Sequence, residues 1–253
     1  MANERRIQSI TKAAAVLRAL IDVDESIRLV DLAQIVGMNR SSLHVMLATL
    51  VDEDLVDQTG PGMYRLGLGT FELGAAALSQ AGLSSRIAPP MEALARETGE
   101  AVSLSVIHDH SALLVSRYES SQVLRATIRA GTRMPLTTSA SGRCIIAHVP
   151  AEEREQLVPS TERHLASAED LARRLDLIRR RGYDTQRDEW AVGVSSTAVP
   201  IFDRGRRPIA ALSVSMPSTR YSEESWIDEL SAAARALEDV LSSLPRSALA
   251  DML

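Results

Sequence analysis

Four neighbouring side chains, Arg40, Ser41, Ser42 and His44, have the chemistry of a nucleic-acid contact. Hydroxyl groups and free helix N–H groups bind phosphate oxygens, and an arginine can pair with guanine through two hydrogen bonds. Taken alone, residues of these types are more often the solvated face of a helix. Their function therefore depends on the elements that surround them.

Residues 29–50 predict two short helices joined by a tight turn. Gly37 suits the left-handed position that ends a helix, and the Asn39 side chain can accept a hydrogen bond from the N–H groups that open the next helix. Two helices linked so closely are typical of a helix-turn-helix, whose second helix enters the DNA major groove. The apolar positions, which recur at helical spacing, are Leu32, Ile35 and Val36, then Leu43, Met46, Leu47 and Leu50.

The segments on either side of this pair complete a winged helix. Two extended runs, residues 55–58 and 63–66, flank a turn rich in Gly and Pro and predict a hairpin. A hairpin directly behind a recognition helix is a wing, which places Tyr64 and Arg65 near the DNA backbone. A supporting helix is expected over residues 7–21, with an apolar face of Ile10, Ala14, Leu17, Leu20 and Ile21.

The rest of the chain predicts an α+β unit with helices packed on an antiparallel sheet. The predicted domains are residues 1–68, a linker helix within 69–86 and a second domain at 87–253. The linker helix is expected over 70–79, and the next helix begins at Pro89-Pro90 and stops at Gly99. Further strands are expected at 101–107, 112–118, 123–129, 194–202 and 208–216, and further helices at 139–148, 151–157, 168–181 and 222–244.

A second group of polar residues predicts a small-molecule site. Residues 137–142 open a helix with small side chains, so its free N–H groups and its positive dipole end favour a carboxylate. Ser213 and Ser215 share one face of their strand, as do Val194 and Ser196. Buried serines need hydrogen-bonding partners, which a polar ligand can supply. The alternative, which composition alone does not separate from the first, is that these serines face solvent or bond to the backbone.

Composition and charge limit the class of protein. The chain has 253 residues, 45% hydrophobic and 24% charged, which is ordinary for a soluble globular protein. Its net charge of −5 excludes a surface that is basic overall but not a local basic face. No apolar run reaches the roughly 18 residues of a membrane span, and the polar start MANERRIQS lacks the apolar core of a signal peptide. We expect a cytoplasmic protein with no membrane segment, metal or cofactor.

Cys144 and His148 stand four residues apart, and so on one face of a predicted helix. A Cys/His nucleophile pair would also need an orienting group and an oxyanion site, and the sequence identifies neither. A buried structural cysteine is the favoured interpretation. Asp188 and Glu189 are adjacent, so their side chains diverge, and we interpret them as loop charges.

With these features in order, the chain resembles the IclR family of bacterial transcription regulators along nearly its whole length. The resemblance rests on several separate motifs rather than on one. They are QSI at residues 8–10, the helix pair at 29–50, YRLG at 64–67, GTRMPL at 131–136, SASGR at 139–143, RGY at 181–183, DE at 188–189 with Gly193, AVPIFD at 198–203 and ALSVS at 211–215.

The resemblance implies a winged helix for an operator, a linker helix that dimerises, and a GAF-like domain that binds a small effector, often an organic acid. It also implies homodimers or dimers of dimers. The family's effector pocket corresponds here to Met134, Ala140, Ser141, Val194, Ser196, Ser213 and Ser215. Trp190 would lie beside that pocket, where its ring could cover a ligand or belong to the core.

Two residues depart from the family pattern. Val45 follows His44, where a basic residue is common, so a base contact is lost or is replaced by contact with a thymine methyl group. Gln186 stands where some acid-binding relatives carry an acid.

The sequence thus predicts a non-enzymatic regulator, a repressor of a catabolic operon. The alternatives are an activator, a small-molecule hydrolase that uses Cys144, or a DNA-binding scaffold without an effector.

Overall fold

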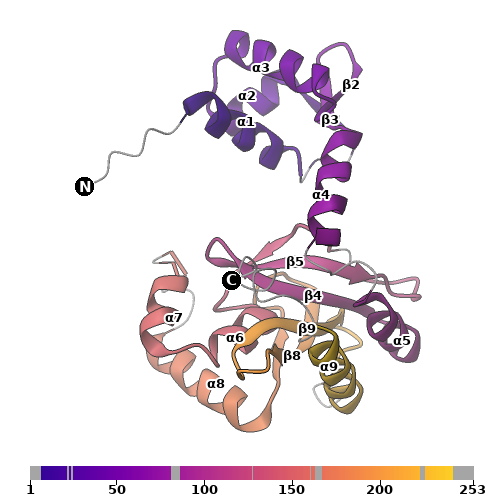
Figure 1. Ribbon diagram of the computed structural model, residues 1–253, viewed down its shortest axis with the longest axis vertical. Coiled ribbons are helices and arrows are strands. Elements are labelled where there is room, and N and C mark those ends of the chain that lie inside the picture. The colour runs from indigo at the N-terminus through magenta and orange to yellow at the C-terminus, as the bar shows by residue number, and fades with distance from the viewer. Residues whose placement is uncertain are drawn as a thin grey trace. The chain divides into compact units, whose positions relative to one another are not determined.

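The computed structural model describes residues 7–21, 23, 25–80, 86–126, 128–159, 161–162, 167–222 and 226–241. The chain divides into two compact units, Met1–Leu78 and Ser79–Leu253. Figure 1 shows the elements of both. The division falls inside the predicted linker helix, and the expected bounds of 1–68, 69–86 and 87–253 stay a prediction.

The N-terminal unit is a winged helix-turn-helix. Helix α2, Leu29–Val36, ends at Gly37 in the left-handed conformation, with φ of 66°. Helix α3, Arg40–Asp52, begins where the Asn39 side chain accepts a hydrogen bond from the Ser42 N–H, at 2.8 Å. Both capping predictions are therefore confirmed. The other elements are α1, Gln8–Ala19, the wing strands β2, Val56–Gly60, and β3, Met63–Leu66, and a short β1, Ile27–Arg28, which adds a third strand in the order β1-β3-β2.

The apolar face predicted for α1 was partly wrong. Ile10 and Ile21 are exposed by 63% and 42%, whereas Val16 and Leu20 are buried. The helix carries two overlapping apolar stripes, and the stripe that includes Val16 faces α2 and α3 because it continues their shared core. Ile35 of α2, also 63% exposed, was wrongly placed in that core.

Helix α4, Leu68–Gln80, follows the wing and confirms the helix predicted over residues 70–79. Its residues 71–77 are exposed. Three of its large apolar side chains, Leu68, Phe71 and Leu73, are exposed by 64% to 71%.

The C-terminal unit is a six-stranded antiparallel sheet with helices on both faces, which confirms the α+β prediction. The strand order is β6-β5-β4-β9-β8-β7. The strands are β4, Ala101–His108, β5, Ser111–Tyr118, β6, Arg133–Met134, β7, Asp184–Arg187, β8, Val194–Phe202, and β9, Pro208–Pro217.

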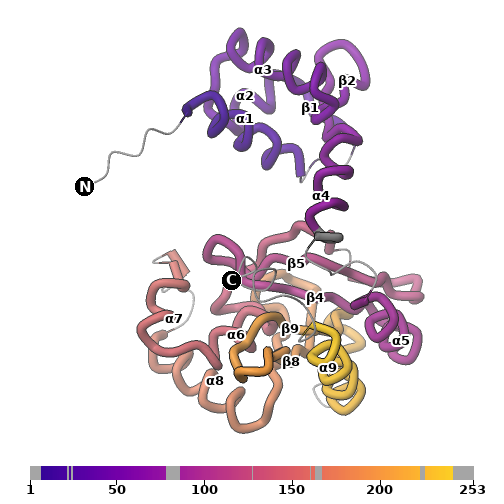
Figure 2. The backbone as a smooth tube through the Cα atoms, viewed as in Figure 1, coloured from indigo at the N-terminus to yellow at the C-terminus, as the bar shows by residue number. Residues whose placement is uncertain are grey.

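Alternation along the strands divides the core into two layers. Val102, Leu104, Leu212 and Val214 pack against α5, Ala88–Thr98, and α9, Ile227–Leu241, which lie side by side (Figure 2). The opposite face carries Ile107, Ala198 and Ala211 and packs against α6, Ala140–Ile146, and α8, Ala168–Arg181. Helix α7, Ala151–Leu157, connects α6 to α8.

The strand predicted at residues 123–129 was wrong for the described residues of that range, 123–126 and 128–129. Val123 and Leu124 are fully and largely exposed, and the Ala126 carbonyl accepts a hydrogen bond from the Arg117 guanidinium rather than from a strand. The edge of the sheet is formed instead by Arg133–Met134, which pairs with Leu113 and Ala112. The last helix begins at Ile227, five residues after its predicted start at residue 222.

Candidate functional site

The first turns of α3 present the residues predicted to contact DNA. Arg40, Ser41, Ser42 and His44 are all exposed. The Ser41 hydroxyl donates to the Asn39 carboxamide at 3.0 Å, so the cap that starts the helix also orients this serine. Val45 on the same surface is 67% exposed, which makes an apolar contact available beside the polar ones.

Tyr64 and Arg65, the two residues predicted in the wing, have different environments in the structure. Tyr64 is 2% exposed and packs in the core of the N-terminal unit, so its predicted position at the DNA backbone was wrong. The alternation of β3 turns it inward and its neighbour Arg65 outward. Arg65 pairs with Asp57 on β2 at 3.0 Å with 54% of its side chain exposed. A phosphate at Arg65 would compete with that carboxylate.

The predicted effector serines meet on the sheet face that α6 covers. Ser215 lies opposite Ser196 on the neighbouring strand, and Ser213 lies opposite Ala198. All three serines are buried. Gln186 of β7 completes this row, because its side-chain amide donates to the Ser196 hydroxyl at 3.3 Å. The four polar residues therefore form one continuous group across three strands.

The apolar members of the predicted pocket lie in the layer above the same face. Met134 and Ala140 are buried there, and Trp190 and Val194 pack against the same cluster partly buried. Ser141, on the first turn of α6, is also buried.

Three further residues on this face were not predicted from the sequence. Ser103 and Ser105 of β4 lie opposite Ser213 and Ala211, and the Ser105 hydroxyl is a buried oxygen without a hydrogen-bond partner. Arg117, with 3% of its side chain exposed, donates to the Ser103 hydroxyl at 3.1 Å. The signal was present, since Ser103 and Ser105 stand two apart on an apolar strand as Ser213 and Ser215 do.

The helix start predicted to receive a carboxylate is already engaged by the chain itself. The Thr137 N–H and hydroxyl donate to Glu162 at 3.1 and 3.2 Å, and the Gly142 N–H donates to the Ser139 hydroxyl at 3.1 Å. Residues 137–142 are all buried. The expectation of accessible N–H groups was therefore wrong for Thr137 and Gly142.

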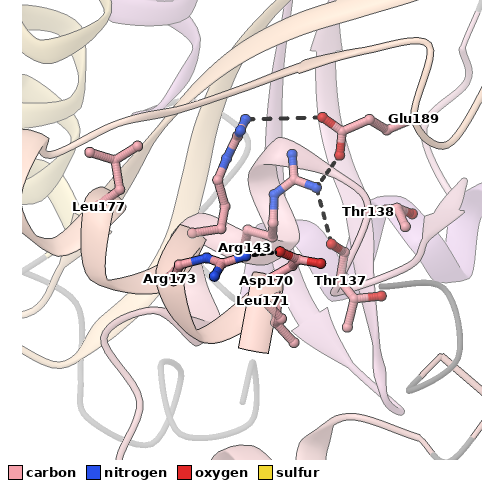
Figure 3. A pocket seen from close by; sticks show the side chains of 9 residues that line it. Thr137, Thr138, Arg143, Asp170, Leu171, Arg173, Leu177 and Glu189 are labelled. Carbon is pink, nitrogen blue, oxygen red and sulfur yellow. Dashed lines mark hydrogen bonds and ion pairs between the residues drawn. The ribbon is translucent and has the colours of Figure 1, made fainter. Parts of the chain in front are cut away.

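Ion pairs between arginines and carboxylates link α6, α8 and β7. Arg143 donates to Asp184 at 2.6 Å and to Glu189 at 2.5 Å, and Arg174 of α8 donates to Asp184 at 2.7 Å. Burial opposes the positive charge of Arg143, but the two carboxylates outweigh it and raise its pKa. Glu189 is thus a loop charge with a specific buried partner. Figure 3 shows Arg143 and Glu189 among the residues that line an open cavity.

Cys144 and His148 do not make a nucleophile pair. The Cys144 thiol donates to the Ala198 carbonyl at 3.2 Å, and burial, followed by the nearby charge of Asp184, raises its pKa well above the ordinary value. The thiol is therefore neutral at physiological pH. The His148 ring instead packs edge-on against Phe202, with the ring centres 4.8 Å apart.

Models of known protein families match both units of the chain. Residues 9–60 match the IclR helix-turn-helix domain, and residues 75–243 match the C-terminal domain of bacterial transcriptional regulator IclR. The chain belongs to the IclR family of bacterial transcriptional regulators. It is accordingly a DNA-binding transcription regulator.

Named members of the IclR family match along most of the chain. The HTH-type transcriptional regulator KdgR of Escherichia coli is 34% identical over 241 residues, 91% of each chain. The glycerol operon regulatory protein of Streptomyces coelicolor is 32% identical over 91% of this chain and 93% of its own.

Solved structures share the fold. The Pseudomonas aeruginosa HmgR structure has 27% identity and a TM-score of 0.74 and covers 92% of this chain and 98% of its own. An IclR homolog from Microbacterium hydrocarbonoxydans, crystallised with 4-hydroxybenzoate, has 22% identity and a TM-score of 0.75 and covers 93% and 100%. In this chain, no helix within the described ranges is long and apolar enough to cross a membrane.

Proposed function

We propose that this regulator binds a two-fold-related operator as a homodimer, through the exposed residues at the start of α3. Arg40 reads a base or a phosphate, while Ser41, Ser42 and His44 contact the backbone and neighbouring base edges. Arg65 reaches a phosphate from the wing once it leaves Asp57. The surface of α3 supports this assignment, because the polar side chains at its start are exposed while Leu43, Leu47 and Leu50 are buried in the core.

The proposed dimer forms through α4. Large apolar side chains are exposed around this helix, among them Leu68, Phe71 and Leu73. An apolar helix is normally covered in the functional state. A second copy of the same helix is the covering surface proposed here. It would place two α3 helices in one assembly, as an inverted repeat requires.

The proposed effector is a small organic acid, bound on the serine-lined sheet face next to the apolar layer. The pocket residues are Met134, Ala140, Ser141, Gln186, Trp190, Val194, Ser196, Ser213 and Ser215, to which Ser103, Ser105 and Arg117 are added. Arg117 is a buried positive charge that pairs with Glu119 at 2.8 Å and would exchange that partner for the carboxylate of the ligand, and Ser105 has an unpaired hydroxyl. The 4-hydroxybenzoate in the Microbacterium homolog supports the class of ligand.

In this proposal the protein is a repressor of a catabolic operon that works in the cytoplasm without catalysis. The names of two relatives, the transcriptional repressor IclR and an acetate operon repressor, support the direction of regulation. The neutral, buried Cys144 thiol argues against nucleophilic hydrolysis. The effector acts by binding one arrangement of the DNA-binding units more tightly than another.

The exposed polar surface of α3 carries the proposal. Its test is to sequence genomic fragments that the full-length protein retains at physiological salt, where nonspecific phosphate contacts are weak. Enrichment of a few promoters that share an inverted repeat, lost in Arg40→Ala, is the expected result. Retention of the same promoters by Arg40→Ala would remove Arg40 from the interface, and no enrichment with or without added metabolites would reject the operator model.

The effector site has a separate test in thermal melting. 4-Hydroxybenzoate, pyruvate and gluconate are the first carboxylates to try, because a ligand that binds only the folded state raises the melting temperature. We expect the shift that any of them causes to disappear in Ser213→Val/Ser215→Val, with operator binding unchanged. A shift that persists in this variant would place the ligand elsewhere.

A further inference from the structure

A second cavity lies outside both of these sites. It has a volume of about 510 Å³ and opens between the start of α6, one side of α8 and the loop after β7. This volume falls within the range of about 300 to 1,000 Å³ of small-molecule sites. None of the proposed DNA or effector residues lines it. The nine lining residues are Thr137, Thr138, Arg143, Asp170, Leu171, Arg173, Arg174, Leu177 and Glu189.

Arginine and carboxylate side chains line the cavity in two pairs, and the two members of one pair are not hydrogen-bonded to each other. The Arg174 guanidinium and the Glu189 carboxylate are 4.0 Å apart, which is beyond hydrogen-bonding distance, and both side chains are about one-third exposed. The second pair in the cavity is formed by Arg173 and Asp170 (Figure 3). A simple anion or a simple cation would meet repulsion from one member of each pair. Arg174 also donates to Asp184 and Glu189 also accepts from Arg143, so a ligand that carries both charges would add a second partner to each.

The same cavity has an apolar side. Leu171 and Leu177 line it from α8, and Leu177 remains 44% exposed. Covering these side chains would remove apolar surface from water. The wall therefore fits an apolar group attached to the doubly charged part of a ligand.

We propose that this cavity binds a free α-amino acid with an apolar side chain. Its carboxylate lies between Arg174 and Arg173, its ammonium group lies against Glu189 and Asp170, and its side chain covers Leu171 and Leu177. The 4.0 Å between Arg174 and Glu189 leaves no room for a group between them, but the adjacent ammonium and carboxylate of an α-amino acid can contact both side chains from the open side of the cavity.

The loop after β7 connects this cavity to the sheet-face pocket. Glu189 lines the cavity, while Trp190, the next residue, packs in the apolar layer of the other pocket. A ligand that engages Glu189 therefore acts on the segment that carries Trp190. Binding at the two sites is coupled, and by linkage each ligand changes the affinity of the other by the same factor.

The test is calorimetric titration of the full-length protein with L-leucine, leucinamide and 4-methylpentanoate. Leucinamide lacks the carboxylate and 4-methylpentanoate lacks the ammonium group, so we expect only L-leucine to bind. Leu177→Glu and Arg173→Gln change exposed side chains, and each should raise the Kd for L-leucine by at least about tenfold. Arg180→Gln makes the same change on α8 at an exposed residue outside the cavity, and it should bind as the unchanged protein does.

Four results would overturn the proposal. They are no heat of binding with L-leucine, equal binding of 4-methylpentanoate, full binding by Leu177→Glu, and loss of binding in Ser213→Val/Ser215→Val, which would place L-leucine on the sheet face. Operator selection without amino acid is independent of all four. Failure of the cavity assignment is thereby distinguishable from failure of the proposed DNA-binding surface.

Discussion

At the scale of single residues, the contact of Val45 with DNA can be tested directly. Its side chain is 67% exposed and has no charged or hydrogen-bonding group for a phosphate. If it contacts a thymine methyl group, replacing that thymine by uracil should weaken operator binding about fourfold, from the loss of roughly 0.8 kcal/mol for one buried methyl-sized group. The measurement is a competition titration with operators that carry one uracil at a time.

Val45→Ala is the control for that contact. It should bind the thymine and uracil operators with equal affinity, because the side chain that distinguishes them has been shortened. Should the variant still discriminate between the two, another residue reads the methyl group.

His148 gives a pH dependence of stability. Burial, followed by the charges of Arg179 and Arg206, lowers its pKa from the ordinary value of 6.5. The unfolded chain therefore binds the proton more readily, and the stabilising contribution, complete above about pH 6.5, is lost as the pH falls toward the lowered value. We expect His148→Phe, which keeps a ring against Phe202 and removes the unpaired Nε2 atom, to lose less stability than the unchanged protein between pH 7.5 and 5.5. An equal loss of unfolding free energy in the two proteins over this pH range would contradict this prediction.

At the scale of elements, α6 depends on a glycine that helix propensity disfavours. A Cβ at Gly142 would lie 2.6 Å from the Leu136 Cα and 2.8 Å from the Leu136 carbonyl oxygen, both backbone atoms that cannot turn aside. Gly142→Ala should therefore destabilise the protein by about 1 to 3 kcal/mol, although alanine is favoured over glycine by about 1 kcal/mol in an unconstrained helix. Denaturant unfolding measures the sign, and a gain in stability would mean that the segment before α6 shifts freely.

The elements also show where sequence reasoning works. Gly37 and Asn39 predicted the helix-turn-helix because capping is a local property. Alternation predicted that Ser213 and Ser215 share a face, but only the tertiary fold shows that this face meets α6 and the serines of β4. The composition of residues 123–129 suits a strand, which is why one was predicted there. The edge of β5 with which it would pair is occupied instead by residues 133–134.

Predictions of individual side-chain positions failed where two local patterns competed. Tyr64 and Arg65 are adjacent, so only one of them can face outward from β3. The aromatic ring of Tyr64 is buried in the core, and Arg65 faces outward. The second cavity was not predicted at all. Its lining comes from residues 137–143, 170–177 and 189, which are distant in the sequence and carry no shared motif.

At the scale of the whole molecule, the apolar surface of α4 predicts the assembly. Phe71 and Leu73 are exposed by 71% and 64% and point in different directions around the helix, so a single chain leaves both in water. Phe71→Glu/Leu73→Glu should convert a dimer to monomers, because charges buried in an apolar interface without partners are costly. Sedimentation velocity at micromolar concentration measures the change.

Loss of the dimer should also be measurable at the operator. A monomer engages one half-site, so the avidity of two linked α3 helices is lost and operator affinity should fall by about a hundredfold or more. Glu72→Gln, a change at the exposed residue between the two substituted positions, should keep both the dimer and the affinity. If the double variant remains dimeric, subunits associate through another surface. If it is monomeric but binds the inverted repeat as tightly as before, one winged helix is enough for recognition, and α4 has a purpose other than pairing the two recognition helices.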